Sequence, residues 1–364
     1  MNYFGNRYDE EFIYRRLSWE TWLENLTYNQ ITGGSIEYST DASLKVTGKL
    51  NFTGYELPNE EDLVRVYYRF KDESGESQEM ALATFLVNYS SVTYNDTLNG
   101  LQATGSLNAE SVLSVLNNEK IGYPLTIKRA TLAIAKVREI IEERNLKVNV
   151  VMSPFVLTSD YTFKESDTIL TVVNTLLSMA DYKNAYPDAY GVIQIEPRDY
   201  NYESLTFKND KNSIMYPEVE NENQLSSTPN VVKLFMNTDT ASILAIAKNL
   251  SGSKASLEAR GNREVTYTES VSNVGSGNYS SLLKKKAEEV LKEKSSTVEY
   301  VKFQHAWVPM KLNDVININY GDFIWAGNLD NYSIELAPSV KTTSKVKRVL
   351  TEDVVITSTV EVYR

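Results

Sequence analysis

The sequence predicts an α+β fold that is mainly β, with two small β-barrel-like domains and a small α+β domain between them. Short segments with apolar residues at every second position dominate residues 33–103 and 231–362, and this period is typical of strands with one buried face. Apolar residues recur at helical spacing between residues 131 and 180. We therefore expect domains at residues 1–124, 125–205 and 206–364.

The first predicted domain combines an N-terminal arm with the first β-barrel. Residues 8–31, which contain two tryptophans, are interpreted as a docking arm or short helix. Residues 64–70 and 81–89 alternate on either side of a turn-forming segment, which predicts a hairpin. A further segment, 91–103, completes the meander, with breaks expected at Asn95-Asp96 and Asn99-Gly100. The candidate core and assembly residues are Val46, Leu50, Phe52, Val66, Phe85 and Val87.

The second predicted domain alternates helix and strand. A short helix over 108–117, with Asn108 as its N-cap, precedes it. We then expect strands at 123–128, 148–156 and 190–195, a helix that Thr131 caps and that ends at Asn145, and a helix that starts at Ser166.

The third predicted domain is a second β-barrel with one inserted helix. Its first residues, 209–229, are polar and predict a loop. The inserted helix is expected at about residues 280–294, because Leu283, Ala287 and Leu291 recur at helical spacing. The expected strands are 231–235, 243–248, 265–268, 298–307, 314–320, 344–350 and 354–362.

The composition excludes several classes of protein. The chain has 48 acidic and 37 basic residues, a net charge of −11 and no strongly basic segment, which argues against sequence-specific nucleic-acid binding. Without cysteine there is no disulfide, no zinc–cysteine site and no thiol nucleophile. No apolar run approaches the ~20 residues of a membrane helix. The N-terminus shows no secretory signal, so we expect synthesis in a cytoplasm.

No residue pattern points to catalysis. The single histidine, His305, lies in an alternating segment without a nucleophile tied to it, so a packing or surface role is favoured. Adjacent carboxylates occur at 10–11, 60–62 and 142–143, and solvated faces explain them better than glycosidase or metal pairs. We therefore predict no enzyme activity, no catalytic or metal-binding residue and no cofactor.

The order of the parts resembles that of the hub proteins of phage tails and related contractile injection machines. Segments similar to the family's opening strand and central hairpin are Ser43–Phe52, Asp62–Tyr68 and Leu82–Val87. Downstream similarities are the helix starting at Ser166, Tyr190–Ile193, Pro229–Val232 and Leu312–Ile316. Hubs often carry Gly-Asp where this chain has Asn313-Asp314, and asparagine also tolerates the positive φ of such a turn.

The resemblance implies a structural virion protein. Such hubs form homotrimers at the tail tip or baseplate and join the sixfold tail tube to the threefold spike. The implied partners are a tail tube protein, a spike, tip or cell-wall hydrolase subunit on another chain, and other baseplate or distal tail proteins. DNA would pass through the lumen without stable binding, and acidic charge there would keep it sliding. Stable membrane insertion is not expected.

Two alternatives come from other classes of protein. The β-rich domains and the 24 tyrosines also agree with a carbohydrate-recognition or adhesion module of a phage or cell surface. A carboxylate-based glycosidase ranks third, because no constellation of acids supports it. Glycan binding would favour the first alternative, and turnover of cell-wall material would favour the second.

Overall fold

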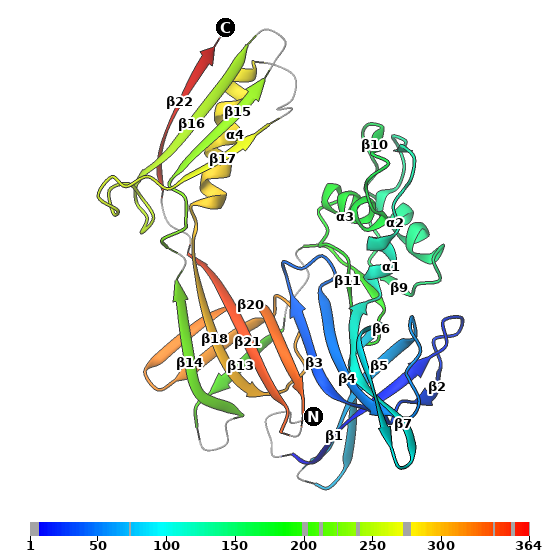
Figure 1. Cartoon of the computed structure of the whole chain (residues 1–364). Coiled ribbons are helices and arrows are strands. Elements are labelled where there is room, and N and C mark those ends of the chain that lie inside the picture. Colours follow the sequence, from blue (N-terminus) through cyan, green and yellow to red (C-terminus); the bar gives the residue numbers. More distant parts are fainter. Residues whose placement is uncertain are drawn as a thin grey trace. The chain divides into compact units, whose positions relative to one another are not determined.

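A computed structural model describes residues 7–72, 74–198, 203–210, 214–223, 225–237, 241–271, 278–337, 339–350 and 354–363. The chain forms two compact units (Figure 1). Unit 1 is Met1–Glu218 with Phe303–Lys345, and unit 2 is Val219–Lys302 with Val346–Arg364. The predicted class, α+β and mainly β, is confirmed. The division into three domains remains a prediction.

The largest sheet has 13 strands, and none of the sheets closes on itself in the described part of the chain. Its main order is β14-β18-β21-β20-β3-β4-β7-β6-β5-β1-β2; β19 also pairs with β20, and β13 pairs with β19. The strands are β1 (Tyr8–Leu17), β2 (Glu24–Thr27), β3 (Ile31–Ser39), β4 (Val46–Gly54), β5 (Leu63–Lys71), β6 (Ser77–Thr97), β7 (Gly100–Ser111), β13 (Ser204–Lys208), β14 (Met215–Asn223), β18 (Thr297–Ala306), β19 (Val315–Tyr320), β20 (Phe323–Leu336) and β21 (Lys341–Leu350).

The predicted hairpin of β5 and β6 is present, and the two strands pair antiparallel. Three other local expectations for this region were wrong. The short helix offered as one alternative for residues 8–31 is absent, because this segment forms strands and β1 pairs with β5 along its length; the docking arm stays a prediction. Asn95 and Asp96 do not interrupt β6; they pair with Gln102 and Leu101 in an exposed hairpin, where polar side chains remain hydrated. Asn108 is no helix cap, since it lies within β7.

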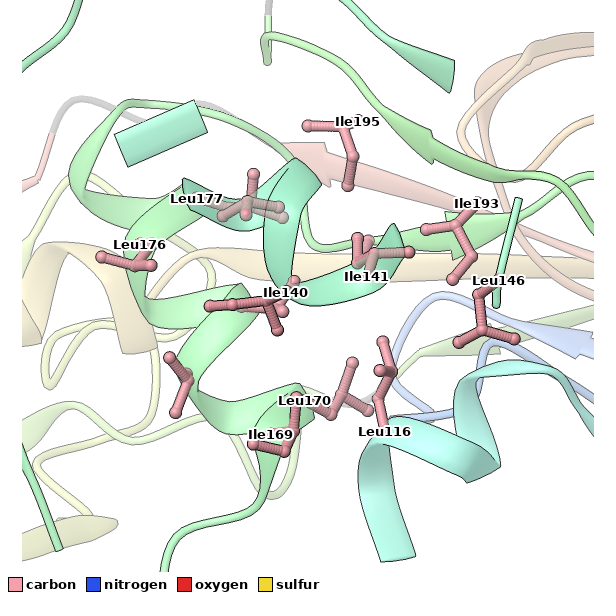
Figure 2. Close-up of a cluster of buried hydrophobic side chains, with 14 of the residues drawn as sticks. Leu116, Ile140, Ile141, Leu146, Ile169, Leu170, Leu176, Leu177, Ile193 and Ile195 are labelled. Carbon is pink, nitrogen blue, oxygen red and sulfur yellow. The ribbon is translucent and has the colours of Figure 1, made fainter. Parts of the chain in front are cut away.

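Unit 1 also contains a small α+β region. Its elements are α1 (Leu113–Asn118), β8 (Leu125–Ile127), α2 (Ala133–Glu142), β9 (Val148–Val150), β10 (Tyr161–Phe163), α3 (Ile169–Met179), β11 (Tyr186–Pro187) and β12 (Ile193–Ile195). Figure 2 shows the apolar faces of α2 and α3 meeting over Ile193 and Ile195. The predicted helices therefore exist because their apolar stripes bury against a common core.

The helix starts in this region differ from those predicted. Leu132 precedes α2 without a side-chain cap, so Thr131 does not cap it. Thr168 rather than Ser166 caps α3, and its Oγ1 accepts a hydrogen bond from the backbone N–H of Thr171 at 3.2 Å. The strand predicted at 148–156 ends at Val150, and Met152 and Val156 are exposed.

Unit 2 contains a four-stranded sheet covered on one face by a helix. The strand order is β17 (Thr266–Ser270), β15 (Val231–Asn237), β16 (Ser242–Ser251) and β22 (Val355–Tyr363). The predicted helix is α4 (Tyr279–Lys294), and Asn278 caps it. Leu283, Ala287 and Leu291 of α4 belong to the same buried cluster as Leu234 and Ala245 of the sheet.

The loop predicted at 209–229 was wrong in part, because β14 occupies Met215–Asn223. This strand is at the end of the 13-stranded sheet, so its glutamates face solvent and no clear alternation marks it. The expected positive φ at Asn313 is confirmed, with a value of 72°.

Candidate assembly surfaces

The six candidate core residues lie on one face of the part of the 13-stranded sheet formed by β4, β5, β6 and β7, which we call the first sheet. The register aligns Leu50 with Leu107 and Val87 with Ala109, and Val66 lies on the same face as Phe85 through its pairing with Ala83. All six side chains are buried. They are therefore brought together, while their contribution to assembly remains a prediction.

Hydrogen bonds connect the opposite face of this sheet to the α+β region. Arg65 donates to Thr84 Oγ1 at 3.0 Å and to the carbonyl of Tyr190 at 3.0 Å. Thr84 in turn donates to the carbonyl of Ala189 at 2.9 Å. A Cβ at Gly191 would lie 3.0 Å from both Thr84 and Trp22, and its φ is +77°. Only glycine allows this turn to approach so closely.

The end of the β6–β7 hairpin, residues 92–102, carries an apolar surface that we call the hairpin arm. Tyr94 and Leu101 lie on the same face of the hairpin as Phe85, which is closer to the base of the hairpin. Tyr94 pairs with Ala103, and Leu101, Ala103 and Ser111, the partner of Phe85, all point to one side of β7. The side chain of Tyr94 is 54% exposed, Leu101 is 58% exposed, and Leu98 is fully exposed at the turn. The apolar face of the first sheet therefore continues into solvent along the hairpin arm.

Unit 2 has two open sheet edges, β17 and β22 (Figure 1). Among the described residues, β22 pairs only with β16 and β17 only with β15. Glu361 is the one charged residue of β22, and most of its other positions are Val, Ile or Thr. Edge strands are usually protected by lysine, proline or a cover, because their unpaired backbone groups attract other strands. The edge of β22 has no such protection within its own sequence.

His305 is buried in an aromatic environment. Its Nε2 lies 2.8 Å from the hydroxyl of Ser344, its Nδ1 lies 2.8 Å from the carbonyl of Ala306, and its ring contacts Phe207 and Phe303. Burial lowers the pKa of His305 to about 4. The ring is therefore neutral at pH 7, with Ser344 as its only side-chain hydrogen-bond partner among the described contacts.

The carboxylate pairs named above do not converge on a common point. Glu142 pairs with Arg138 at 2.7 Å and Glu11 pairs with Arg69. Asp62 forms an ion pair with Arg16 and accepts a hydrogen bond from the hydroxyl of Tyr28. Within the described ranges, no group of three or more metal-ligating side chains is placed to hold an ion. The absence of a cofactor and of enzyme activity remains a prediction.

A bidentate ion pair joins the segments that follow α1 and α2. Arg144 Nε and Nη2 each lie 2.6 Å from an oxygen of Glu119. The hydrogen bonds from Arg144 lower the pKa of the Glu119 carboxyl below its usual value. This pair is structural, because both of its members are engaged with each other.

No helix in the described part of the chain has the length and apolar content to span a bilayer.

No protein-family model and no curated protein matches the sequence. Solved structures do match it. The 43 kDa tail protein of prophage MuSo2 from Shewanella oneidensis is 10% identical, with a TM-score of 0.63 over 92% of this chain and 98% of that one. A tail protein from Neisseria meningitidis MC58 is also 10% identical, with a TM-score of 0.61 over 94% and 97%.

A third similar structure is that of a protein complex from Francisella. A chain of the Francisella PdpA–VgrG complex is 8% identical, with a TM-score of 0.55 over 97% of this chain and 55% of that one. The predicted resemblance is therefore confirmed at the level of the fold: this chain has the fold of phage tail proteins.

Proposed function

We propose that this chain is a structural subunit of a phage-type tail, and that it forms a homotrimeric hub at the tail tip or baseplate. The observation that carries the proposal is the match to tail proteins over nearly the full length of both chains. In this role the chain joins a sixfold tube to a threefold spike, forms part of the channel and resides in the virion. Its partners are then the tube protein, the spike or a lytic subunit, and other baseplate or distal tail proteins.

The open edges of unit 2 supply a physical route to a ring. Because β17 runs parallel to β15, and β16 runs antiparallel to both β15 and β22, the two edge strands point in the same direction. Rotation about an axis along the strands preserves that direction. The β22 edge of one copy can therefore pair in parallel with the β17 edge of the next, a heterologous contact that closes a ring.

Native mass spectrometry of the full chain tests the proposed trimer. Thr357→Lys with Thr359→Lys places two lysines on the β22 edge, and Thr266→Lys with Thr268→Lys does the same on the β17 edge. Lysines on an edge strand oppose pairing with another strand. We expect wild type to be trimeric and each double variant monomeric, whereas Ser281→Lys, on the exposed side of α4, leaves the trimer intact.

Mixing the two double variants distinguishes a ring from a symmetric dimer contact. Each mixed pair retains one wild-type β22 edge and one wild-type β17 edge, so a heterodimer forms and stops growing. A wild-type chain that stays monomeric at tens of micromolar, or a trimer that survives both double variants, contradicts the ring. Quantitative mass spectrometry of purified tails tests the location, with three copies per particle expected.

The carbohydrate-binding alternative remains a hypothesis. Saturable binding to a glycan array, together with absence from tail particles, would favour it over the hub.

A further inference from the structure

The α+β region of unit 1 carries a hollow that is a second candidate interaction surface. A hollow of about 340 Å³ lies on α2 and is lined by Ala135, Arg138, Glu139, Glu142, Glu143 and Met152. Positions 135, 138, 139 and 142 lie on one side of the helix, because they are three or four residues apart. Ala135 leaves space there that a longer side chain would fill.

One apolar lining residue and two residues near it in the sequence are exposed. Met152 is 55% exposed. Leu132, one helical turn before Ala135, forms an isolated β-bridge with Val156, and both side chains are more than 40% exposed. Isolated exposed apolar residues are ordinary, but several beside one hollow indicate an interaction site.

The charged part of the lining is mainly acidic. Three lining glutamates face one lining arginine, which leaves an excess of two negative charges. Glu139 and Glu142 each form an exposed ion pair within α2, with Lys136 and Arg138. Glu143 is held less closely, at 3.7 Å from Arg144, which makes its shorter contacts with Glu119. The rim therefore retains acceptors for an incoming cation.

A sheet edge lies close to the hollow along the chain. In the described sheet of β11, β12 and β9, the strand β9 is an edge and pairs only with β12. The segment that carries Met152 follows β9 directly. A peptide in this position would meet an apolar anchor site, an acidic rim and a sheet edge, which is a combination used in peptide recognition.

We propose that this surface binds a peptide segment of another protein that carries an apolar anchor residue flanked by lysine or arginine. Charge complementarity selects this occupant. A second copy of the chain would bring two acidic rims together in a symmetric contact, and nucleic acid or an anionic membrane would be repelled. The proposal concerns unit 1 alone and does not depend on the trimer.

Selection from a displayed library of random 12-residue peptides tests the proposal, with the immobilised full chain as bait. We expect enriched peptides to combine an apolar residue with at least two lysines or arginines. Synthetic versions are then measured by fluorescence anisotropy. Ala135→Arg fills the hollow and cancels one of its two excess negative charges, so binding weakens at least tenfold, and Met152→Ser weakens it several-fold.

A matched control distinguishes this surface from general stickiness. Leu98→Ser removes a fully exposed leucine from the hairpin arm and leaves peptide affinity unchanged. Circular dichroism checks that each variant folds. We expect Met152→Ser to fold, because Met152 is exposed. Raising NaCl from 50 to 300 mM weakens binding, because the rim contacts are screened. The proposal is wrong if no peptides are enriched, or if the enriched peptides lack basic residues. It is also wrong if peptide affinity is unchanged in both Ala135→Arg and Met152→Ser. A dimer of the chain that Met152→Ser dissociates would show that the surface binds a second copy instead.

Discussion

Phe85→Ala tests whether the face that carries the six candidate residues is the core of the first sheet. Phe85 is fully buried on β6, and its ring lies against Gly48 of β4, where a Cβ would be 3.4 Å away. Removing a buried phenylalanine costs about 3–5 kcal/mol, from lost transfer free energy and the cavity left behind. Because native proteins are stable by only about 5–15 kcal/mol, the variant loses a large fraction of its stability.

Urea unfolding followed by circular dichroism measures this loss as a fall in the midpoint at unchanged slope. The matched control is Tyr94→Ala, on the same strand but 54% exposed, which changes the free energy of unfolding by less than about 0.5 kcal/mol. Phe85→Asp prevents folding, because it adds an unpaired charge to the same site. A Phe85→Ala protein within about 1 kcal/mol of wild type would refute the assignment of Phe85 to the core.

Three further predictions concern unit 1. The pKa of His305 is about 4 in the folded chain and about 6.5 in the unfolded chain, so between these pH values only the unfolded chain binds the proton. The free energy of unfolding therefore falls by about 3 kcal/mol as pH drops from 6.5 to 4, and in His305→Gln the free energy of unfolding depends less steeply on pH. Arg144→Ala lowers stability at pH 7 by at most about 1 kcal/mol, since Glu119 is partly exposed, and the difference between variant and wild type disappears as pH falls through the lowered pKa of Glu119; a constant difference at all pH values would contradict this. Gly191→Ala costs more than Gly122→Ala in thermal unfolding, because both have φ above +70° but only the Cβ at 191 would meet neighbours; equal costs would show that the turn does not pack against Thr84 and Trp22.

Strands with one buried face were predictable, and strands at edges were not. In β4, buried Val46, Leu50 and Phe52 alternate with more polar residues, so the period alone identifies the strand. By contrast, Glu218 and Glu220 of β14 face solvent, and their polarity suggested a loop. The edge position that explains this polarity depends on pairing with a distant strand, which no local pattern records.

One of the candidate surfaces was predictable from the sequence and one was not. The buried positions of the first sheet followed from alternation, but the hollow on α2 did not. Residues 148–156 are rich in β-branched residues and predicted one strand, whereas the structure ends the strand at Val150 and exposes Met152. Helix starts were also missed, because a leucine precedes α2 where a polar cap was expected.

The discontinuity of unit 2 has a consequence for the order of events during translation. Its sheet is built from Val219–Lys302 but is completed by Val346–Arg364, which the ribosome adds after all the remaining strands of unit 1. Until β22 emerges, β16 lacks one neighbour and the edge proposed for ring closure does not exist. If the ring forms as proposed, nascent chains on the same messenger RNA cannot yet pair through this edge, and association waits for a chain whose other strands have already been made.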